Sequence, residues 1–300
     1  MGSARMDSDQ RLAASLPVCL SGGRIAVGEV PESLENAIAS GVLWQAAPGQ
    51  LLLEIPDRAR VLVRRDEIIV MPLAPDALTG IGPLLRGTPF AAAMFLRGHF
   101  ACSAAAVAGP DGAVLIIGRA ASGKSTLAAA LMQRGLRLLA DDAASIILAP
   151  TGTAMIAPVW PELVHWSDTE SCLFKHGIPP WLERWPSPVA DYPYWKVRSD
   201  RFCPTETPLK ATYHLRRDRL VGSVQSTPMG GIAILAHRML VPYQAAIAEA
   251  FVDPGVLLKI YQGVSACSPI VDVEMPIRQP GSFDELADGI MRDCGWPITT

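Results

Sequence analysis

The sequence lacks any long apolar run that is free of charged residues. A membrane-spanning helix needs roughly 20 mostly apolar residues in a row, and the most apolar stretch, residues 113–132, is interrupted by Arg119 and Lys124. The first residues, MGSARMDSDQRL, include acidic side chains and no apolar core of the kind that a secretory signal has. We therefore expect a cytoplasmic protein that has no membrane partner.

Excess charge of one sign, paired cysteines and spaced histidines are also missing. Lys and Arg together number 26, Asp and Glu 29, and the net charge of −3 gives no electrostatic footprint for nucleic acid. The six cysteines lie far apart without a CxxC pair, which favours reduced thiols, with a disulfide set as the minor alternative. Four histidines show no ligand spacing, which argues against a zinc site: His165, His176, His214 and His237.

What the chain does have is apolar residues in short, regular patterns. Half of its 300 residues are hydrophobic, which excludes a disordered chain and suits one large domain or two small ones. Residues 50–55, 59–64 and 66–71 are β-type runs separated by turn residues, which predicts a small antiparallel meander. Helical spacing over 77–97 predicts one or two short helices. We expect residues 1–98 to form a small β-rich N-terminal domain with a structural or a recognition role.

From residue 99 the pattern becomes α/β. The run 113–117 is typical of a central strand, and 126–134 holds helix formers before Gly135, a suitable C-terminal cap. Prolines after Pro150 predict a loop-rich region. The other expected elements are strands at 103–108, 136–140, 145–148, 210–215 and 231–236, and helices at 243–251 and 283–293. We expect residues 99–300 to form a second domain.

The strongest motif is the complete pattern G-x-x-x-x-G-K-[ST] between the expected strand and helix. Glycines let successive N–H groups turn inward into an anion nest, and the following helix adds its positive N-terminal end. The lysine of such a loop reaches the β- and γ-phosphates, and its serine offers a hydroxyl to Mg²⁺. The expected phosphate-binding residues are Gly118, Arg119, Ala120, Ala121, Ser122, Gly123, Lys124, Ser125 and Thr126.

Two adjacent acids, Asp141 and Asp142, follow the next expected strand. In a parallel sheet this strand end faces the same crevice as the phosphate loop. One carboxylate can accept a proton from an attacking hydroxyl, and the other can hold Mg²⁺ directly or through water. A solvated acidic turn is the alternative. Basic groups that neutralise a transferred phosphoryl group are also needed, and Lys196, Arg198 and Arg201 are candidates, with solvated surface charge as the alternative.

A succession of three segments over residues 98–150 resembles a known family. ACSAAAV, GAVLIIGRAASGKSTLAAALMQRG and LRLLADDAASI are similar to the kinase domain of HPr kinase/phosphorylase and its relatives. The most specific feature is a phosphate loop followed by R-G-x-R-L-[LI]-A-D-D, here residues 134–142. Weaker likeness continues through 195–198, 208–213 and 269–291. The resemblance implies an α/β P-loop kinase domain of the HPr kinase/phosphoenolpyruvate carboxykinase type, ATP and Mg²⁺ as cofactors, and assembly into homo-oligomers.

Carried over residue by residue, the resemblance assigns roles within the expected site. Lys124 would bind the β- and γ-phosphates, and Ser125 the metal. Asp141 would be the acid/base residue for a substrate serine hydroxyl, and Asp142 would support the metal site. Lys196 best matches a recurring basic residue of the family.

The chain departs from the family pattern in two places. Cys102 stands where the family has a histidine before the loop, which argues against phosphorolysis of phosphoserine, and a buried small residue is the favoured interpretation. The metal-binding E-[IV]-R-G-x-G segment is absent, and the region 162–185 is rich in aromatic residues and proline instead. HPr itself is therefore not the expected substrate.

With its small β-rich N-terminal module, the chain is similar to the shorter relatives of this family. Those relatives resemble the tailoring kinases of lasso-peptide clusters, which phosphorylate the C-terminal serine of a precursor peptide. We therefore expect a serine kinase acting on a peptide or small protein. A non-catalytic nucleotide-binding regulator and a small-molecule kinase are the alternatives. Aromatic residues can line a peptide groove or pack under a long loop: Trp160, Trp166, Trp181, Trp185, Tyr192, Tyr194 and Trp195.

Overall fold

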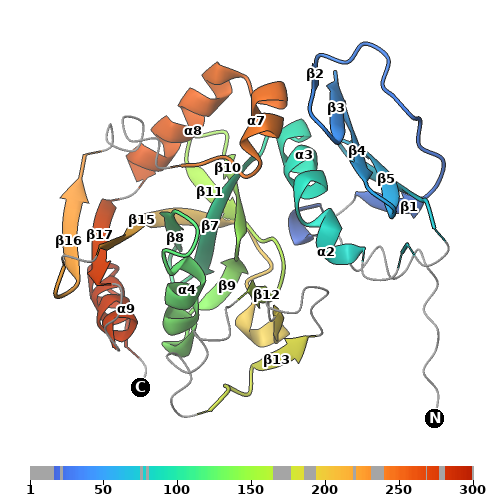
Figure 1. Cartoon of the computed structure of the whole chain (residues 1–300). Coiled ribbons are helices and arrows are strands. Elements are labelled where there is room, and N and C mark those ends of the chain that lie inside the picture. Colours follow the sequence, from blue (N-terminus) through green and yellow to red (C-terminus); the bar gives the residue numbers. More distant parts are fainter. Residues whose placement is uncertain are drawn as a thin grey trace, which may run out of the picture. The chain divides into compact units, whose positions relative to one another are not determined.

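The computed structural model forms two compact units (Figure 1). The first comprises Met1–Ala101 with Pro242–Pro254, and the second Cys102–Val241 with Gly255–Thr300. Structure is described for residues 17–20, 23–74, 77–78, 81–164, 177–185, 194–218, 221–230, 240–267, 269–276 and 281–298.

The division of the chain differs from the sequence expectation, which placed all of residues 99–300 in one domain. Helix α7 (Ala245–Phe251) packs against α3 (Thr88–Leu96) and so belongs to the first unit. The backbone N–H of Tyr243 donates to the Ala101 carbonyl at 2.9 Å, which ties this segment to the end of the first unit. The position and length of an apolar helix can be predicted from its sequence. The unit that it packs against depends on tertiary contacts, which the sequence pattern does not give.

The first unit contains a six-stranded sheet in the order β1-β6-β5-β4-β3-β2. The meander expected from the sequence is confirmed, because β4, β5 and β6 pair antiparallel in succession, while β1 joins β6 in parallel. The strands span Arg24–Val27 (β1), Ala39–Ser40 (β2), Trp44–Ala47 (β3), Gln50–Ile55 (β4), Ala59–Arg64 (β5) and Glu67–Pro72 (β6). A short 3₁₀ helix, η1 (Val18–Leu20), precedes them.

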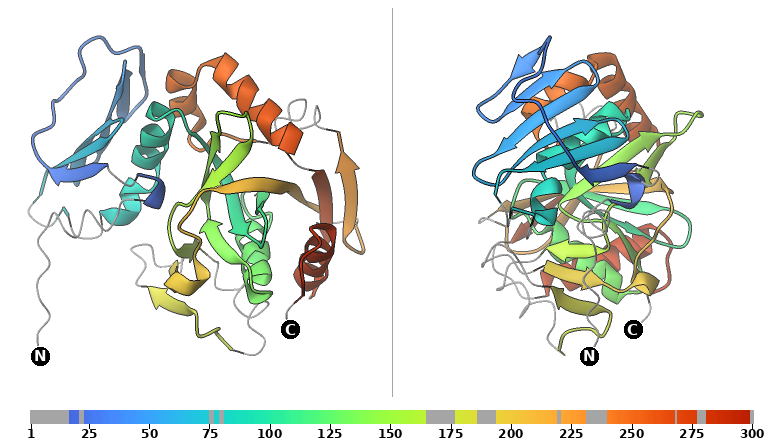
Figure 2. Two further views of the ribbon diagram at one scale, coloured as in Figure 1. Left: turned by 180° about the vertical axis from the view of Figure 1, so that it is seen from behind. Right: turned by 90° about the vertical axis from the view of Figure 1, so that its right-hand side faces the viewer.

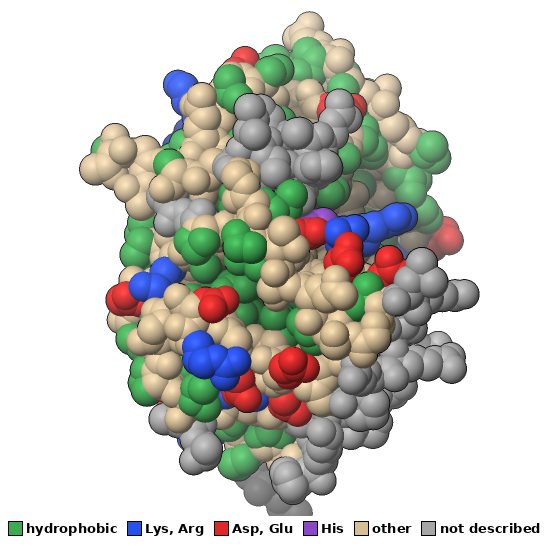
Figure 3. All heavy atoms as spheres, turned by 90° about the vertical axis from the view of Figure 1, so that its left-hand side faces the viewer, with side chains coloured by type: hydrophobic (Ala, Val, Ile, Leu, Met, Phe, Trp, Pro, Cys, Tyr) green, Lys and Arg blue, Asp and Glu red, His purple; other side chains and the backbone are tan. Residues whose placement is uncertain are grey.

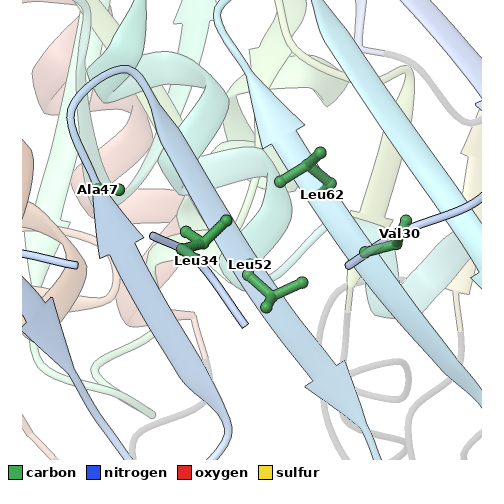
Figure 4. Packing of buried hydrophobic residues seen from close by; sticks show 5 residues of the cluster. All are labelled: Val30, Leu34, Ala47, Leu52 and Leu62. Atoms are coloured by element: carbon green, nitrogen blue, oxygen red, sulfur yellow. The ribbon is translucent and has the colours of Figure 1, made fainter. Parts of the chain in front are cut away.

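Both faces of this sheet are covered, which explains why its strands are apolar nearly throughout. Helix α3, which follows α2 (Gly82–Leu85), packs against β4, β5 and β6. On the other face a buried cluster forms, in which Val30 and Leu34 from the segment after β1 lie over Leu52 and Leu62 (Figure 4). The Leu34 N–H donates to Oε1 of Gln45 at 2.8 Å, which fixes this segment to the sheet.

The second unit is built on an eight-stranded sheet in the order β11-β10-β7-β8-β15-β17-β16, with β9 also paired to β7. The strands are β7 (Phe100–Ala108), β8 (Ala113–Gly118), β9 (Arg137–Ala140), β10 (Ala143–Leu148), β11 (Ala154–Ala157), β15 (Thr207–Asp218), β16 (Gln225–Met229) and β17 (Ile270–Pro276). Helices α4 (Lys124–Gln133) and α9 (Ser282–Asp293) lie side by side (Figures 1 and 2), and α4 contacts β8. The predicted central strand at 113–117 is confirmed.

Strand directions bring several strand ends to one edge of the sheet. Strand β15 is parallel to β8 and to β17. Strands β8 and β9 are both antiparallel to β7, so they run parallel to each other. The residues that follow β8, β9 and β15 therefore share one edge, which is where open α/β sheets bind ligands.

Several elements were not expected from the sequence. The predicted loop-rich region contains a three-stranded sheet in the order β12-β14-β13, formed by Glu162–Val164 (β12), Tyr194–Val197 (β14) and Leu182–Trp185 (β13), and a 3₁₀ helix, η2 (Ser199–Arg201). Helix α8 (Pro254–Cys267) was also missed, because Pro254 and Gly255 read as turn residues although proline suits a first helical position. The strand expected at 231–236 lies outside the described residues.

No helix in the described ranges is long and apolar enough to cross a membrane. On the face drawn in Figure 3, basic and acidic side chains lie next to one another among hydrophobic ones.

We predict that the buried cluster of Val30, Leu34, Leu52 and Leu62 contributes strongly to the stability of the first unit. Leu52→Ala should lower the free energy of unfolding by about 2–5 kcal/mol, because it leaves a cavity between the sheet and Leu34. Chemical denaturation measures this loss. Val42→Ala is the matched control, since Val42 is 99% exposed and Leu52 only 5%; equal effects of the two truncations would contradict the assignment.

Candidate active site

The loop between β8 and α4 has the backbone that a phosphate-binding loop needs. Gly118 has φ 147° and Gly123 has φ 101°, conformations that side chains rarely adopt. A Cβ added at Gly118 would lie 2.5 Å from the Leu215 carbonyl oxygen, and one at Gly123 would lie 2.5 Å from Cζ of Phe283. Both glycines of the motif are therefore required by conformation and by close approach of their neighbours, as the sequence predicted.

The same loop leads directly into the N-terminal end of a helix. The first N–H groups of any α-helix have no intrahelical partner, and α4 begins at Lys124 directly after the loop. Within the loop, the Ser122 N–H donates to the Arg119 carbonyl at 3.1 Å. The Ser122 side chain is 5% exposed, and among the described residues its Oγ has no hydrogen-bond partner. Buried polar groups normally have partners, so this loop fits an absent polar ligand.

The side chain of Lys124 folds back over the loop. Its Nζ donates to the carbonyl oxygens of Gly118 at 3.1 Å and of Arg119 at 3.0 Å. Burial lowers the pKa of Lys124, and the negative charges of Asp141 and Asp142 oppose that shift. The ammonium group thus lies at the loop and near both acids.

Asp141 is the most perturbed acid of the site. Its side chain is 8% exposed, and burial raises its pKa to about 7, against the opposing effects of the Val164 N–H and the Ser125 hydroxyl. The Val164 N–H donates to Oδ2 at 2.8 Å. The other oxygen, Oδ1, has no partner within bonding geometry among the described residues. Asp141 is therefore a buried acid with one carboxyl oxygen held by the backbone of β12.

The structure places Asp142 at the same edge in a different environment. Its side chain is exposed and its φ is 66°. Its carbonyl oxygen accepts from the Ala104 N–H at 3.2 Å, and Ala104 pairs with Ile117 on the other side, directly before the loop. Ser125, Asp141 and Asp142 supply hydroxyl and carboxylate oxygens, which are the donors that Mg²⁺ prefers, and Mg²⁺ usually takes only one or two protein carboxylates. The residues present thus fit a magnesium ion.

The remaining predicted site residues lie in varied positions. Arg119, Ala120 and Ala121 are exposed on the loop, and Thr126 is 6% exposed in the first turn of α4. Lys196 is exposed on β14, where it pairs in register with Glu162 and Glu183 on its two neighbours. Its strand is paired with β12, whose Val164 N–H bonds Asp141. The structure therefore brings the loop and the two acids together, and a role for Lys196 stays a prediction.

The sequence analysis missed three contributors to the site, which are Val164, Arg217 and Phe283. The backbone of Val164 holds Asp141, and a backbone donor has no sequence signature. Arg217 donates from Nε to the Ser122 carbonyl at 3.3 Å, and its Cζ lies 5.6 Å from the ring centre of Phe283. A basic residue just past the expected strand 210–215 is a signal that could have identified Arg217.

Cys102 is fully buried, in agreement with the favoured interpretation. Burial raises the pKa of its thiol to about 12, and only the positive charge of Lys124 opposes this shift. The thiol is therefore protonated at neutral pH, and it cannot act as a histidine-like base there.

The aromatic residues after Pro150 pack rather than line an open groove where they are described. Trp160, Trp181 and Trp195 are 8%, 7% and 1% exposed. Arg201 lies over Trp181 at 6.0 Å, and Arg198 pairs with Asp200. Trp166, Tyr192, the side chains of Trp185 and Tyr194, and the histidines His165, His176 and His237 lie outside the described residues. His214 has Nδ1 2.7 Å from Oδ1 of Asp272.

Comparisons with known proteins give a likeness to solved structures and none to a family model or a curated sequence. No protein-family model matches the chain, and no curated protein matches its sequence. A solved structure, the HPr(Ser) kinase/phosphatase from Coxiella burnetii, matches with 13% identity and a TM-score of 0.34 over 64% of this chain and 94% of that chain. The candidate site is therefore defined by the geometry of the chain itself.

We predict that Asp141 makes the chain less stable as the pH rises. Its folded pKa of about 7 exceeds its ordinary value of 3.8, so between these values the folded chain holds a proton that the unfolded chain has released. This contribution to stability is complete below the ordinary pKa and is lost as the pH rises to about 7, with no further change above. Asp141→Asn should remove this loss.

Unfolding by denaturant at about pH 5 and about pH 8 tests the prediction. The Asn variant should gain on the wild type by on the order of a few kcal/mol between the two conditions. A constant difference between the two proteins would show that the pKa of Asp141 is not raised.

Proposed function

We propose that the chain is an ATP- and Mg²⁺-dependent phosphotransferase that acts on a serine hydroxyl of a peptide or small protein. The observation that carries this proposal is the meeting of Lys124, Ser125 and Asp141 at the end of β8. A loop of this geometry binds a phosphate chain, and a buried carboxyl beside it has a pKa close to neutral pH. A general base works best when its pKa is near the working pH.

The residues divide the reaction among them. The loop amides and Lys124 bind the phosphates and neutralise charge that develops on the γ-phosphoryl group. Asp141 accepts the proton of the acceptor hydroxyl through Oδ1. At the same time the oxygen of the acceptor hydroxyl forms a bond to the γ-phosphorus, and the bond between that phosphorus and the ADP oxygen breaks. Ser125 and Asp142 would hold Mg²⁺, which supplies positive charge to the phosphate oxygens.

The acceptor follows from the sequence resemblance rather than from the site. Residues 98–150 resemble kinases that phosphorylate serine, and the absence of the metal-binding glutamate segment argues against HPr as the substrate. The C-terminal serine of a lasso precursor peptide is the acceptor that we propose. Kinases of this kind often assemble, so we also propose a homo-oligomer.

We predict that Asp141→Asn retains ATP binding and loses transfer by about 10²–10⁴-fold, because the variant keeps the shape of the site without a proton acceptor. The wild-type rate should rise with pH through about 7, where Asp141 loses its proton. Transfer of labelled phosphate to peptides ending in serine, with the same peptides ending in alanine, measures both.

Glu54→Gln, an exposed acid of the first unit, is the control that should leave transfer unchanged. Full activity of Asp141→Asn would exclude the proposed base. Binding of ATP without any labelled peptide or small molecule would favour a regulatory nucleotide-binding module instead.

Lys196 is our candidate for a second cation, since its strand belongs to the same small sheet as Val164. We predict that Lys196→Met lowers kcat about tenfold or more and leaves the dissociation constant of ATP unchanged, because it would act on charge formed during transfer. Steady-state kinetics and calorimetric titration separate the two quantities. Lys259→Met on α8 is the matched exposed control; equal rates for the two variants would remove Lys196 from the mechanism.

A further inference from the structure

A second feature lies against the phosphate loop, on the side away from Asp141. Arg217, at the end of β15, donates from Nε to the Ser122 carbonyl at 3.3 Å. The guanidinium group lies over the ring of Phe283, at the start of α9, with Cζ 5.6 Å from the ring centre. The ring edge in turn approaches Gly123 so closely that a Cβ there would lie 2.5 Å from Cζ.

These contacts place the guanidinium group beside the Phe283 ring and the loop carbonyl, and the residue is exposed. A planar guanidinium group that is already held in place stacks on aromatic rings and nucleobases with little further loss of freedom. Its neighbour Arg216 is bound by Asp272 and Glu274 of β17.

The order of the strands gives the site a direction. Asp141 follows β9, on the β7 side of β8, whereas Arg217 is the penultimate residue of β15, on the opposite side of β8. Lys124, which in such loops reaches the β- and γ-phosphates, lies close to Asp141. A nucleotide bound in the loop would therefore point its terminal phosphate toward Asp141, and its nucleoside end would extend to the side where Arg217 lies.

We propose that Arg217, backed by Phe283, is the platform on which the purine base of the bound nucleotide stacks. This inference rests on the proposed function, because it takes a nucleoside triphosphate as the ligand. It adds residues for base recognition that the phosphate-loop motif does not contain. Stacking of a base on such a surface contributes about tenfold or more to affinity.

Titration of ATP and of inorganic tripolyphosphate, each with Mg²⁺, tests the platform. The wild type should bind ATP about tenfold more tightly than tripolyphosphate. Arg217→Lys and Phe283→Leu should reduce this difference to about twofold or less, with the affinity for tripolyphosphate unchanged, since the positive charge or the loop is retained while the planar surface is lost.

One variant controls for indirect effects. Arg216→Lys changes the adjacent arginine, which is held by β17, and should keep the full preference for ATP. Thermal unfolding of each variant checks that α9 remains folded.

The outcomes distinguish this proposal from the proposed function. Equal loss of ATP and tripolyphosphate affinity in Arg217→Lys would mean that Arg217 shapes the loop or contacts phosphate, which overturns the platform. Equal binding of the two ligands by the wild type would also overturn it, while phosphate transfer to a peptide would leave the kinase standing. A wild type that binds neither ligand would overturn the proposed function itself.

Discussion

The candidate site depends on the antiparallel placement of β7 between β8 and β9. Because both neighbours run opposite to β7, their carboxyl ends meet at one edge of the sheet. Ala104 shows this directly, since it pairs with Ile117 on one side and donates to the Asp142 carbonyl on the other. The phosphate loop and the acidic pair are adjacent for this reason, although a helix separates them in the chain. A shift in this pairing would separate Lys124 from Asp141.

Burial then gives the assembled residues unusual proton affinities. Removal from water raises the pKa of Asp141 and lowers that of Lys124, because the interior disfavours either charge. The negative charge of Asp141 opposes the shift of Lys124. The small sheet contributes here, since the Val164 N–H donates to one carboxyl oxygen of Asp141. The small sheet, which the sequence did not predict, thus holds the carboxyl group of Asp141 in place.

The sequence predicted the parts of the site that are local or follow from simple topology. The phosphate loop is contiguous, so Gly118, Gly123 and Lys124 were identified from their spacing. Asp141 was identified because a strand after a crossover helix returns to the same edge. Val164, Arg217 and Phe283 come from segments far apart in the chain, and their meeting depends on strand pairing and helix packing. For the same reason, the sequence located α7 but not the unit that it joins.

Charge balance around the loop determines when Asp141 can act as a base. A triphosphate chain in the loop would bring several negative charges close to Asp141, and like charges raise the pKa of a carboxyl group further. Asp141 would then hold its proton and could not accept another. The cationic groups at the loop, Lys124 and Arg217, offset part of this charge, and oxygen donors suited to Mg²⁺ lie beside them. An active base at this position therefore requires the cation together with the nucleotide, because the buried acid ionises near neutral pH only when the added negative charge is compensated.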